Sequence, residues 1–391
     1  MTAAPASLEL TAEVHELDRP GDVLEQFDPQ GFAWLHDGTA IVAAGVAARV
    51  AVDDVAAVLR SVVVEGAVGV PGTGPLAVGA LPFDPDAIGT ELVIPALVLT
   101  QRERTYLTRI AAVSPGTPPL TPPTRFVVDA PRTPDEWRAM VEAALVHIAA
   151  HDVDKVVLAR EVLVEGDTAF DITAIVRRLV SQQPGSFVYA TEGFVGASPE
   201  LLVRRTGDTV ESRPMAGTAV ADGDADTLRA LAESVKDQRE HGFVVEAIAD
   251  ALRPVCTDLD VGAVPDVAVF GHVAHLATRF RGRLRGPAPT ALELARLLHP
   301  TPAVGGTPTA RAVELVRQLE RFDRGRYAGP VGWVDADGNG EWAIALRGAE
   351  LDGARARLVA GAGIVAGSDP DAEWAETQAK LEPMLRALVR P

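Results

Sequence analysis

The segment Lys-Val-Val-Leu-Ala-Arg at residues 155–160 constrains the fold more than any other part of this chain. Successive side chains of a strand point to opposite faces, and apolar residues on both faces are typical of a strand buried in a core. We therefore expect a buried strand over residues 156–164, with Lys155 at the rim of the core. Partial desolvation lowers the pKa of a lysine and makes a general base possible. The alternative is a lysine that extends from the strand end into solvent.

Lysine is rare in this chain, which has only Lys155, Lys236 and Lys380 beside 33 arginines. Arginine therefore occupies most positions where any cation is sufficient. Lysine differs because its compact ammonium can lose a proton when it is desolvated, whereas arginine stays charged. Each remaining lysine is a candidate for a position where arginine is unsuitable.

The composition indicates a folded chain with a large core. Hydrophobic residues make up 47% and charged residues 23%, a balance that excludes disorder. The formal net charge of −18 argues against nucleic acid or an anionic membrane surface as partners, and an anionic substrate would need a local cation or metal ion. The chain has one cysteine, no signal-like N-terminus and no apolar run near the about 18 residues of a membrane span. We expect a cytoplasmic protein.

A proline-rich stretch divides the chain, with seven prolines in residues 115–134, and its composition is typical of a linker. Before it, residues 1–113 carry short apolar stretches that indicate strands with a helix or two. After it, Thr133 and Pro134 predict the start of a helix, as N-cap and first helical residue. From residue 155 onward predicted strands and helices alternate, up to a last helix over about residues 371–388.

One predicted helix, over residues 225–252, has carboxylates directed toward the core. Its apolar stripe, projected back along the helix, passes on or beside Glu233, Asp237 and Glu240. Buried carboxylates are unfavourable unless cations or a metal ion compensate them. The alternative is that Gly242 breaks the helix and leaves the acids in solvent.

The last helix carries a second charged cluster of Glu373, Glu376 and Lys380, away from its apolar stripe. A turn at Gly361-Ala362-Gly363 is expected before this helix, and backbone amides at such a turn can receive an anion. The alternative is a solvated face with Glu–Lys pairing at a spacing of four residues. Glu200, which precedes a predicted strand, is a further acid at a strand edge and carries little weight by itself.

Together these segments resemble the chorismate-utilising enzymes, the family of isochorismate, salicylate, anthranilate and aminodeoxychorismate synthases. The resemblance covers about residues 135–390, and residues 1–113 resemble the family only loosely. The matching motifs lie at residues 154–160, 196–202, 213–218, 236–241, 275–278, 299–306, 338–342, 361–364 and 373–380.

The resemblance implies an α+β fold in which residues 1–391 form one large chorismate-binding domain. Two antiparallel β-sheets would pack as a sandwich with helices outside. Residues 114–134 would then be a strap that crosses this domain, and residues 135–391 would form its catalytic part.

The resemblance also implies a Mg²⁺ cofactor and chorismate as the substrate. Glu240 and Glu376 would bind the metal ion, with Asp237 and Glu373 in supporting positions through water. The ion would hold the ring carboxylate of chorismate, which suits a hard cation that keeps several waters and uses few carboxylates. A metal ion would also explain how a protein of negative net charge holds a dianion.

The catalytic roles follow from the same resemblance. Lys155 would be the base that activates the water added at C2, and Glu200 would be the acid that protonates the C4 hydroxyl as it leaves. The two pKa values would have to be pushed apart, that of lysine down and that of glutamate up. The positions expected to contact the substrate are Gly217, Thr218, His275, Arg347, Gly361, Gly363 and Lys380.

Isochorismate synthases are the best match within the family. Lys155 is typical of members that add water, since the ammonia users resembled here carry Gln there, and residues 299–303 resemble isochorismate synthases. A salicylate synthase, which continues to pyruvate release, is the first alternative; an ammonia-using synthase and a non-catalytic chorismate-binding paralogue are the others. Ala216 replaces the nucleophilic lysine of aminodeoxychorismate synthases, which excludes their covalent mechanism. We expect a monomer whose product feeds menaquinone, siderophore or salicylate biosynthesis.

Overall fold

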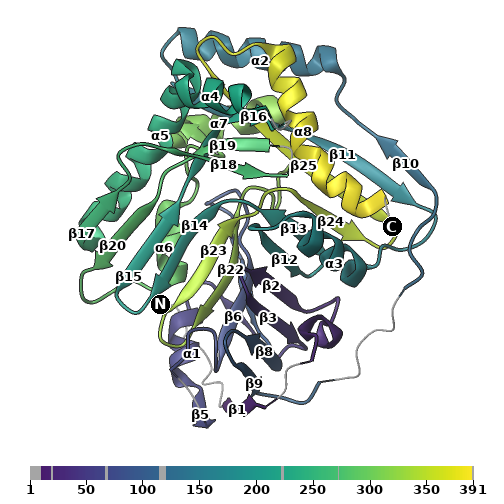
Figure 1. Cartoon of the computed structure of the whole chain (residues 1–391), viewed down its shortest axis with the longest axis vertical. Coiled ribbons are helices and arrows are strands. Elements are labelled where there is room, and N and C mark those ends of the chain that lie inside the picture. The colour runs from purple at the N-terminus through teal and green to yellow at the C-terminus, as the bar shows by residue number, and fades with distance from the viewer. Residues whose placement is uncertain are drawn as a thin grey trace.

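The computed structural model describes residues 10–18, 21–66, 69–113, 120–221, 224–271 and 273–389. Within them, two large β-sheets and one small sheet form the framework (Figure 1). The strand pairs are antiparallel in this part of the chain, except for the parallel pair of β1 and β5.

The first sheet has 13 strands within the described residues. In spatial order they are β10 (Phe126–Asp129), β11 (Lys155–Gly166), β25 (Arg355–Val365), β24 (Gly348–Asp352), β13 (Phe194–Ser198), β12 (Phe187–Thr191), β2 (Phe32–His36), β3 (Thr39–Ala44), β8 (Leu97–Gln101), β9 (Thr105–Arg109), β1 (Thr11–Leu17) and β5 (Val63–Gly66), with β21 (Gly306–Thr307) added to β11.

The second sheet has nine strands, and the small sheet has three, within the same residues. The second sheet runs β17 (Cys256–Val261), β20 (Phe280–Leu284), β15 (Thr209–Arg213), β14 (Leu201–Thr206), β23 (Gly340–Ile344), β22 (Pro330–Asp335), β6 (Leu76–Ala80), β7 (Glu91–Ile94) and β4 (Ala48–Ala51). The small sheet runs β16 (Met215–Val220), β19 (Val273–Ala277) and β18 (Asp266–Phe270).

The two large sheets pack face to face, which confirms the expected sandwich. Trp34 and Tyr189 of the first sheet share a buried cluster with Val78 and Trp333 of the second, and none of these side chains is more than 2% exposed. Both sheets combine early and late parts of the chain, because β2 pairs with β12 and β6 pairs with β22. The early strands of the described residues are thus part of the same sheets as the later strands. The small sheet was not predicted.

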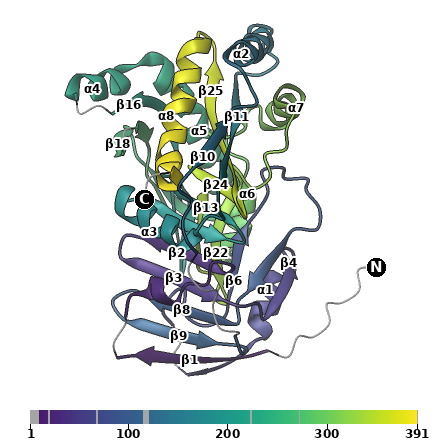
Figure 2. The ribbon, with the colours of Figure 1, turned by 90° about the vertical axis from the view of Figure 1, so that its right-hand side faces the viewer.

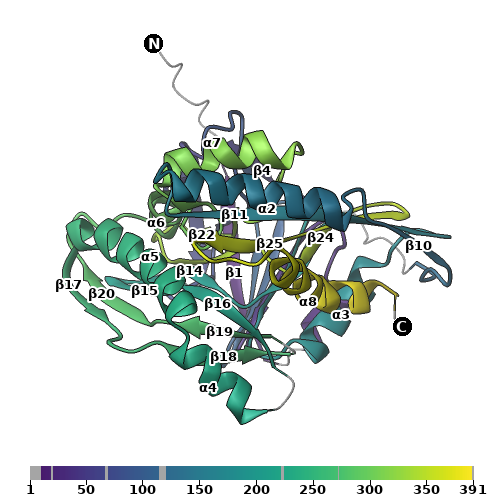
Figure 3. The ribbon, with the colours of Figure 1, turned by 90° about the horizontal axis from the view of Figure 1, so that it is seen from above.

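Helices cover the outside of the sandwich at one end of the molecule (Figures 1 and 2). From above, α2 and α7 lie along one side of β11, and α8 and α3 lie on another (Figure 3). The helices are α1 (Val55–Ser61), α2 (Pro134–Ala149), α3 (Ile172–Gln182), α4 (Ala225–Glu233), α5 (Val235–Leu252), α6 (Ala291–Leu298), α7 (Thr309–Glu320) and α8 (Pro370–Val389), with short 3₁₀ helices at Val23–Gln26 and Arg253–Val255.

The buried strand and the start of α2 confirm the sequence predictions. β11 has Val156 and Leu158 fully buried, and the core around it also contains α5 residues such as Ile248. Thr133 Oγ1 accepts a hydrogen bond from the amide of Glu136, and the carboxylate of Glu136 accepts one from the amide of Thr133, so α2 begins with a capping box.

One predicted helix, over residues 225–252, is wrong, because the structure has two. α4 ends at Glu233, and Ser234 is extended and caps α5 by accepting a hydrogen bond from the amide of Asp237. The exposed Glu233 therefore does not share a helix with Asp237 and Glu240. Gly242 does not break α5, which continues through it to Leu252.

The predicted turn at Gly361-Ala362-Gly363 is also wrong. These residues lie inside β25, where Gly361 pairs with Ala159 and Gly363 pairs with Val157. The long partner strand β11 continues the ladder as far as Val365, so the chain turns only after that residue. An anion-binding turn of free amides is therefore absent at residues 361–363.

The proline-rich stretch is only partly described, because residues 114–119 lie outside the described residues. Its later part contains strand β10, which pairs with β11 over residues 126–129. A short strand at the sheet edge was not predicted within this stretch. That residues 1–391 form one domain, with residues 114–134 as a strap across it, stays a prediction for unfolding experiments.

Candidate active site

A pocket opens between the small sheet, β25, α5 and α8, and it encloses about 620 Å³ counted out to its mouth. Most of the predicted site residues line it. Among the predicted residues, those on its wall are Glu200, Gly217, Thr218, Glu240, His275, Arg347, Gly361, Gly363 and Lys380. Lys155, Asp237, Glu373 and Glu376 are not on the wall, but the first and the last contact wall residues directly.

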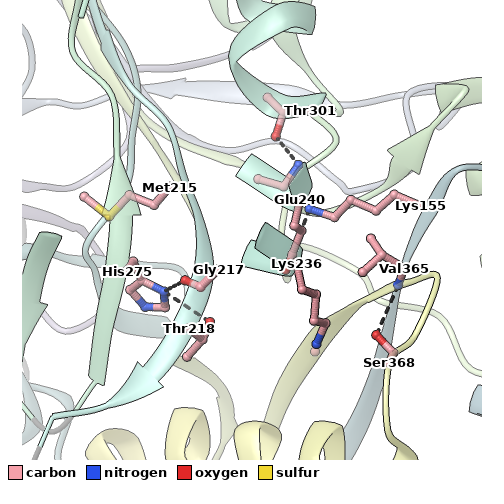
Figure 4. Close-up of polar contacts among 12 residues, drawn as sticks. Lys155, Met215, Gly217, Thr218, Lys236, Glu240, His275, Thr301, Val365 and Ser368 are labelled. Atoms are coloured by element: carbon pink, nitrogen blue, oxygen red, sulfur yellow. Dashed lines mark hydrogen bonds and ion pairs between the residues drawn. The ribbon is translucent and has the colours of Figure 1, made fainter. Parts of the chain in front are cut away.

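Lys155 is fully buried rather than at the rim of the core, because a carboxylate from α5 compensates its charge. Its Nζ lies 3.0 Å from Oε1 of Glu240, and Figure 4 shows the two side chains pointing toward each other. Despite this ion pair, Nζ has no hydrogen-bond partner among the described residues. A buried ammonium with unused donors can donate to a ligand such as water.

Each of the three lysines pairs with a different predicted metal-binding glutamate. Lys155 pairs with Glu240, Lys236 Nζ lies 2.7 Å from Glu373 Oε1, and Lys380 Nζ lies 2.6 Å from Glu376 Oε1. The charges of all three glutamates influence Lys236, which shows that the glutamates lie close together. Burial lowers the pKa of Lys236, but Glu373, Glu240 and Glu376 raise it, and the overall shift is upward.

The Lys380–Glu376 pair has the spacing of four residues that the solvated-face alternative requires. The face is not solvated, however, because both side chains are less than a fifth exposed and Lys380 also donates to the carbonyl of Gly361 at 3.0 Å. Glu373 is 2% exposed, and burial together with the charge of Glu376 raises its pKa. The cluster is therefore partly desolvated.

Glu200 is the buried acid of the pocket, positioned by the tight connection between β13 and β14. Its Oε1 accepts a hydrogen bond of 3.2 Å from the amide of Met215. The side chain is 3% exposed, and burial raises its pKa to about 8 although Met215, Lys155 and Lys380 oppose the shift. Glu200 is therefore mostly protonated at neutral pH and can donate a proton.

His275 and Arg347 form a buried polar unit whose protonation follows from geometry. Arg347 Nη2 lies 2.9 Å from Nε2 of His275, and a guanidinium has only donors, so Nε2 must accept. The ring proton is then on Nδ1, which lies 3.0 Å from the carbonyl of Gly217 and 3.3 Å from Thr218 Oγ1 (Figure 4). Burial and the charges of Arg347 and Lys380 hold the pKa of His275 well below its usual value, so the ring is neutral.

Arg347 has no carboxylate partner within the described residues, although its side chain is buried and its Nη2 contacts His275. Burial lowers the pKa of its guanidinium to about 10, and the group still remains charged at neutral pH. A buried guanidinium that faces a pocket and lacks a carboxylate can bind the carboxylate of a ligand with two parallel hydrogen bonds.

Two predicted glycines lie where a side chain would displace other site residues. A methyl group at Gly363 would overlap the carboxylate of Glu240 and approach Lys155 Cε to 3.1 Å. At Gly217, which has a φ of 71°, it would approach Cβ of Asp237 to 2.9 Å. These glycines therefore make room for the charged residues as well as for a ligand.

The carboxylates fit Mg²⁺ through few direct ligands. No group of three or more acidic, histidine or cysteine side chains in the described part of the chain is arranged closely enough to hold a metal ion. Mg²⁺ usually keeps several waters and takes only one or two carboxylates together with substrate oxygens, so this arrangement suits it better than a cation that needs a full protein cage. Glu240, at the wall of the pocket, and Glu376 are the residues that would bind it.

Sequence reasoning missed two residues of the site. Tyr327 lines the pocket beside Gly361, and burial raises its pKa to about 12, so its hydroxyl stays protonated. His241 follows Glu240 on α5; burial and the charge of Lys155 lower its pKa to about 4, and it contacts Thr278 Oγ1 at 2.7 Å. A tyrosine or histidine next to an apolar segment looks like an ordinary core residue, so the pattern carried no distinguishing signal.

Comparison with known proteins agrees with this geometry. Residues 117–389 match the model of the family described as chorismate binding enzyme. Isochorismate synthase DhbC of Bacillus subtilis is 38% identical over 329 residues, which is 80% of this chain and 81% of DhbC. Isochorismate synthase EntC of Escherichia coli K12 is 39% identical over 326 residues, which is 80% of both chains.

The fold agrees with a solved structure as well. The menaquinone-specific isochorismate synthase MenF from Escherichia coli superimposes with a TM-score of 0.81 at 25% identity, over 98% of this chain and 95% of MenF. No helix in the described residues is long and apolar enough to cross a membrane. The chain belongs to the chorismate binding enzyme family.

Proposed function

We propose that this protein is a Mg²⁺-dependent isochorismate synthase, an isomerase that converts chorismate to isochorismate. The observation that carries the proposal is a buried lysine and a buried, protonated glutamate, Lys155 and Glu200, at one pocket. The relatives DhbC and EntC bear the name isochorismate synthase and match four fifths of this chain.

The reaction moves a hydroxyl from C4 to C2 of the ring through addition of water. Lys155 would take a proton from the water that adds at C2, once its own ammonium has released one, and Glu200 would give its proton to the hydroxyl that leaves from C4. A protonated carboxyl is the form that can act as this acid, and burial supplies it at neutral pH. Bound Mg²⁺ would hold the ring carboxylate and offset its charge.

The remaining wall residues orient the substrate. The guanidinium of Arg347 would bind a substrate carboxylate, and Lys380 would add a second cation nearby. The neutral His275 has its Nε2 lone pair occupied by Arg347, so its role is to hold this guanidinium in place. Gly217 and Gly361 bring backbone to the wall of the pocket.

The charge balance supports a metal ion together with a dianion. With the lysines protonated and Glu200 neutral, the charges of four carboxylates and four cations of the site cancel. They are Asp237, Glu240, Glu373 and Glu376 on one side, and Lys155, Lys236, Lys380 and Arg347 on the other. A dianion alone would leave two uncompensated charges, and one divalent cation removes them.

Incubation of the purified protein with chorismate and Mg²⁺, followed by chromatography of the products, tests the proposal. We expect isochorismate to accumulate with Mg²⁺ and not in the presence of a chelator. Salicylate with pyruvate in its place would transfer the protein to the salicylate synthases. No conversion of chorismate under any condition would contradict both functions.

The cellular context follows from the relatives and is proposed with the function. The relatives include menaquinone-specific and vibriobactin-specific isochorismate synthases, so the product is proposed to enter menaquinone or siderophore biosynthesis. The cytoplasmic location and the monomeric state predicted from the sequence are kept as part of this proposal. Gel filtration with light scattering measures the second of these.

A further inference from the structure

Arg160 is a buried cation that the proposed reaction does not use. It lies on β11, five positions after Lys155, so the two side chains leave opposite faces of the strand. The residue is 1% exposed, and burial lowers the pKa of the guanidinium to about 10, which leaves it charged. Among the residues that the structure describes, no carboxylate pairs with it.

The guanidinium of Arg160 instead binds three residues of one helix, α8. Its Nε donates to Thr377 Oγ1 at 2.7 Å, and its Nη2 donates to Gln378 Oε1 at 2.5 Å. The plane of the group lies over the ring of Trp374 at 3.8 Å. Gln378, which interrupts the apolar stripe of this helix, is therefore the polar partner of a buried arginine.

Trp137 on α2 also contacts this part of α8. The ring of Trp137 meets that of Trp374 edge-on at a centroid distance of 6.2 Å, and Trp137 Nε1 donates to the carbonyl of Pro370 at 3.1 Å. Trp374 thus contacts both Arg160 and Trp137. These contacts hold the first half of α8 against β11 and α2.

The same half of α8 carries the charged residues of the site. At about 100° per residue, Glu373, Glu376 and Lys380 form a stripe about 120° away from the face that Arg160 holds. A carboxylate lies about 6 Å from a helix axis, so a rotation of about 10° moves it by about 1 Å. An error of that size at a catalytic centre can reduce the rate by about 10²-fold.

Arginine is an unfavourable choice if only stability matters. An apolar side chain of similar size buries without the desolvation penalty of a charge and is often neutral or stabilising in such a position. The planar guanidinium of Arg160, however, binds both Thr377 and Gln378 while it covers the Trp374 ring. These contacts oppose rotation of α8 in both directions.

We propose that Arg160 is a positioning residue that fixes the rotation of α8 and thereby holds Glu373, Glu376 and Lys380 toward the pocket. This inference rests on the proposed function for the metal-binding role of the acids and for the identity of the substrate. The contacts of Arg160 and the metal-binding role of the acids are tested separately below.

The test compares Arg160→Met and Arg160→Lys with Arg178→Met. Arg178 on α3 also anchors α8, by donating to the carbonyl of Ala387 at 2.7 Å, but at the end remote from the acids. Binding of Mn²⁺ without chorismate is followed by electron paramagnetic resonance, and kcat and the half-saturating Mg²⁺ concentration are measured with chorismate.

For Arg160→Met we expect Mn²⁺ binding about 10-fold weaker, a half-saturating Mg²⁺ concentration raised by a similar factor and a lower kcat. Arg160→Lys keeps the charge and loses the planar guanidinium, so its Mn²⁺ affinity and kcat should lie between those of Arg160→Met and wild type. Arg178→Met lowers the melting temperature and leaves metal binding at the wild-type value. The proposal is overturned if Arg160→Met lowers the melting temperature alone, with wild-type Mn²⁺ binding and kcat.

Thr377→Val is the second variant in case Arg160→Met does not fold. It removes one acceptor of Arg160 with little change of shape, and a shift of Mn²⁺ affinity of about 2- to 4-fold in the same direction is expected. Unchanged Mn²⁺ affinity in Thr377→Val and Arg160→Lys would overturn the proposal. Wild-type protein that binds Mn²⁺ without converting chorismate would contradict the proposed function only, and protein that binds neither ligand would contradict both.

Discussion

Burial decides the protonation of Glu200, and this has a consequence for stability. The pKa of about 8 in the folded protein lies above the ordinary value of 4.5, so between these pH values the folded protein holds a proton that the unfolded chain has released. The stabilising contribution is complete below about pH 4.5 and is lost as the pH rises through about 8. Over this window it amounts to a few kcal/mol.

Glu200→Gln is the matched variant, because glutamine keeps the acceptor for the Met215 amide and does not titrate. We expect the stability of wild type relative to Glu200→Gln to fall between pH 6 and pH 9, as measured by urea unfolding. The kcat/KM of wild type should fall above about pH 8, and the variant should lose about 10²- to 10⁴-fold at pH 7. A difference in stability that does not change with pH would contradict the protonated state of Glu200.

Two lysine-to-arginine variants separate a base from a simple cation. Lys155→Arg keeps the charge that pairs with Glu240 but cannot release a proton, so kcat should fall by about 10²-fold or more. Lys380→Arg also keeps its charge, and its proposed role needs only a cation, so a loss of about 10-fold or less is expected. Circular dichroism controls for folding of both, and equal losses in kcat would refute the distinction.

The rarity of lysine allowed all three lysines to be assigned to the site from the sequence, but their partners could not be predicted. Pairing of Lys155 with Glu240, or of Lys236 with Glu373, depends on how α5 and α8 meet β11 in space. Burial of Lys155 was underestimated for the same reason. A strand end looks exposed in a sequence when the helix that covers it is more than 80 residues away.

The strand β25 places two glycines against different neighbours, and the structure distinguishes their roles. In Gly363→Ala the new methyl would push aside the flexible Glu240 carboxylate, so the fold should survive while the half-saturating Mg²⁺ concentration rises several-fold. In Gly361→Ala it would come within 2.8 Å of the carbonyl of Leu158 in the paired strand, which cannot move freely. We therefore expect the melting temperature to fall more in Gly361→Ala.

Thermal unfolding and Mg²⁺ titration of chorismate turnover measure the two effects. A Gly363→Ala protein with a wild-type Mg²⁺ response would show that Glu240 is not displaced or does not bind the metal ion.

Elements were predicted well where the local pattern decides them and poorly where a partner decides them. The capping box at Thr133 and the apolar β11 are local signals, and both were confirmed. The glycines at 361 and 363 favour a turn locally, but pairing with β11 extends the strand through them. Ser234 divides two helices because its side chain caps α5, although the apolar periodicity runs through it.

The sheets join the first and last parts of the chain, so we expect the molecule to unfold as one unit. Trp34 in the early part and Trp333 in the late part share the core between the sheets. Far-ultraviolet circular dichroism and tryptophan fluorescence should therefore give coincident urea transitions. Two separate transitions would instead indicate two domains with a boundary near residues 114–134.

Removal of metal should leave this fold intact. Each proposed metal-binding glutamate is paired with a lysine, so a chelator does not leave unpaired buried carboxylates. We expect an unchanged circular dichroism spectrum and a melting temperature lowered by no more than about 3 °C, from loss of ligand binding alone. Unfolding on chelation would show that the lysine pairs do not compensate the acids.

The fold class could be predicted from the sequence because nine ordered motifs identify the family. The family fold is a sandwich of two sheets, and the structure has this sandwich. The small sheet β16–β19–β18 was not anticipated, since its strands are short and follow segments that look like parts of the larger sheet. It supplies Gly217, Thr218 and His275 to the pocket.

Strand β11 contacts two helices through its two faces. Lys155 on one face pairs with α5, and Arg160 on the other face binds α8. The four residues between them can vary among apolar types without changing either direction. Their number cannot vary, because deletion of one residue would bring both cations to the same face and deprive one helix of its contact. Evolution of this segment is therefore free in composition and fixed in length, and alignment gaps should be absent between these two positions.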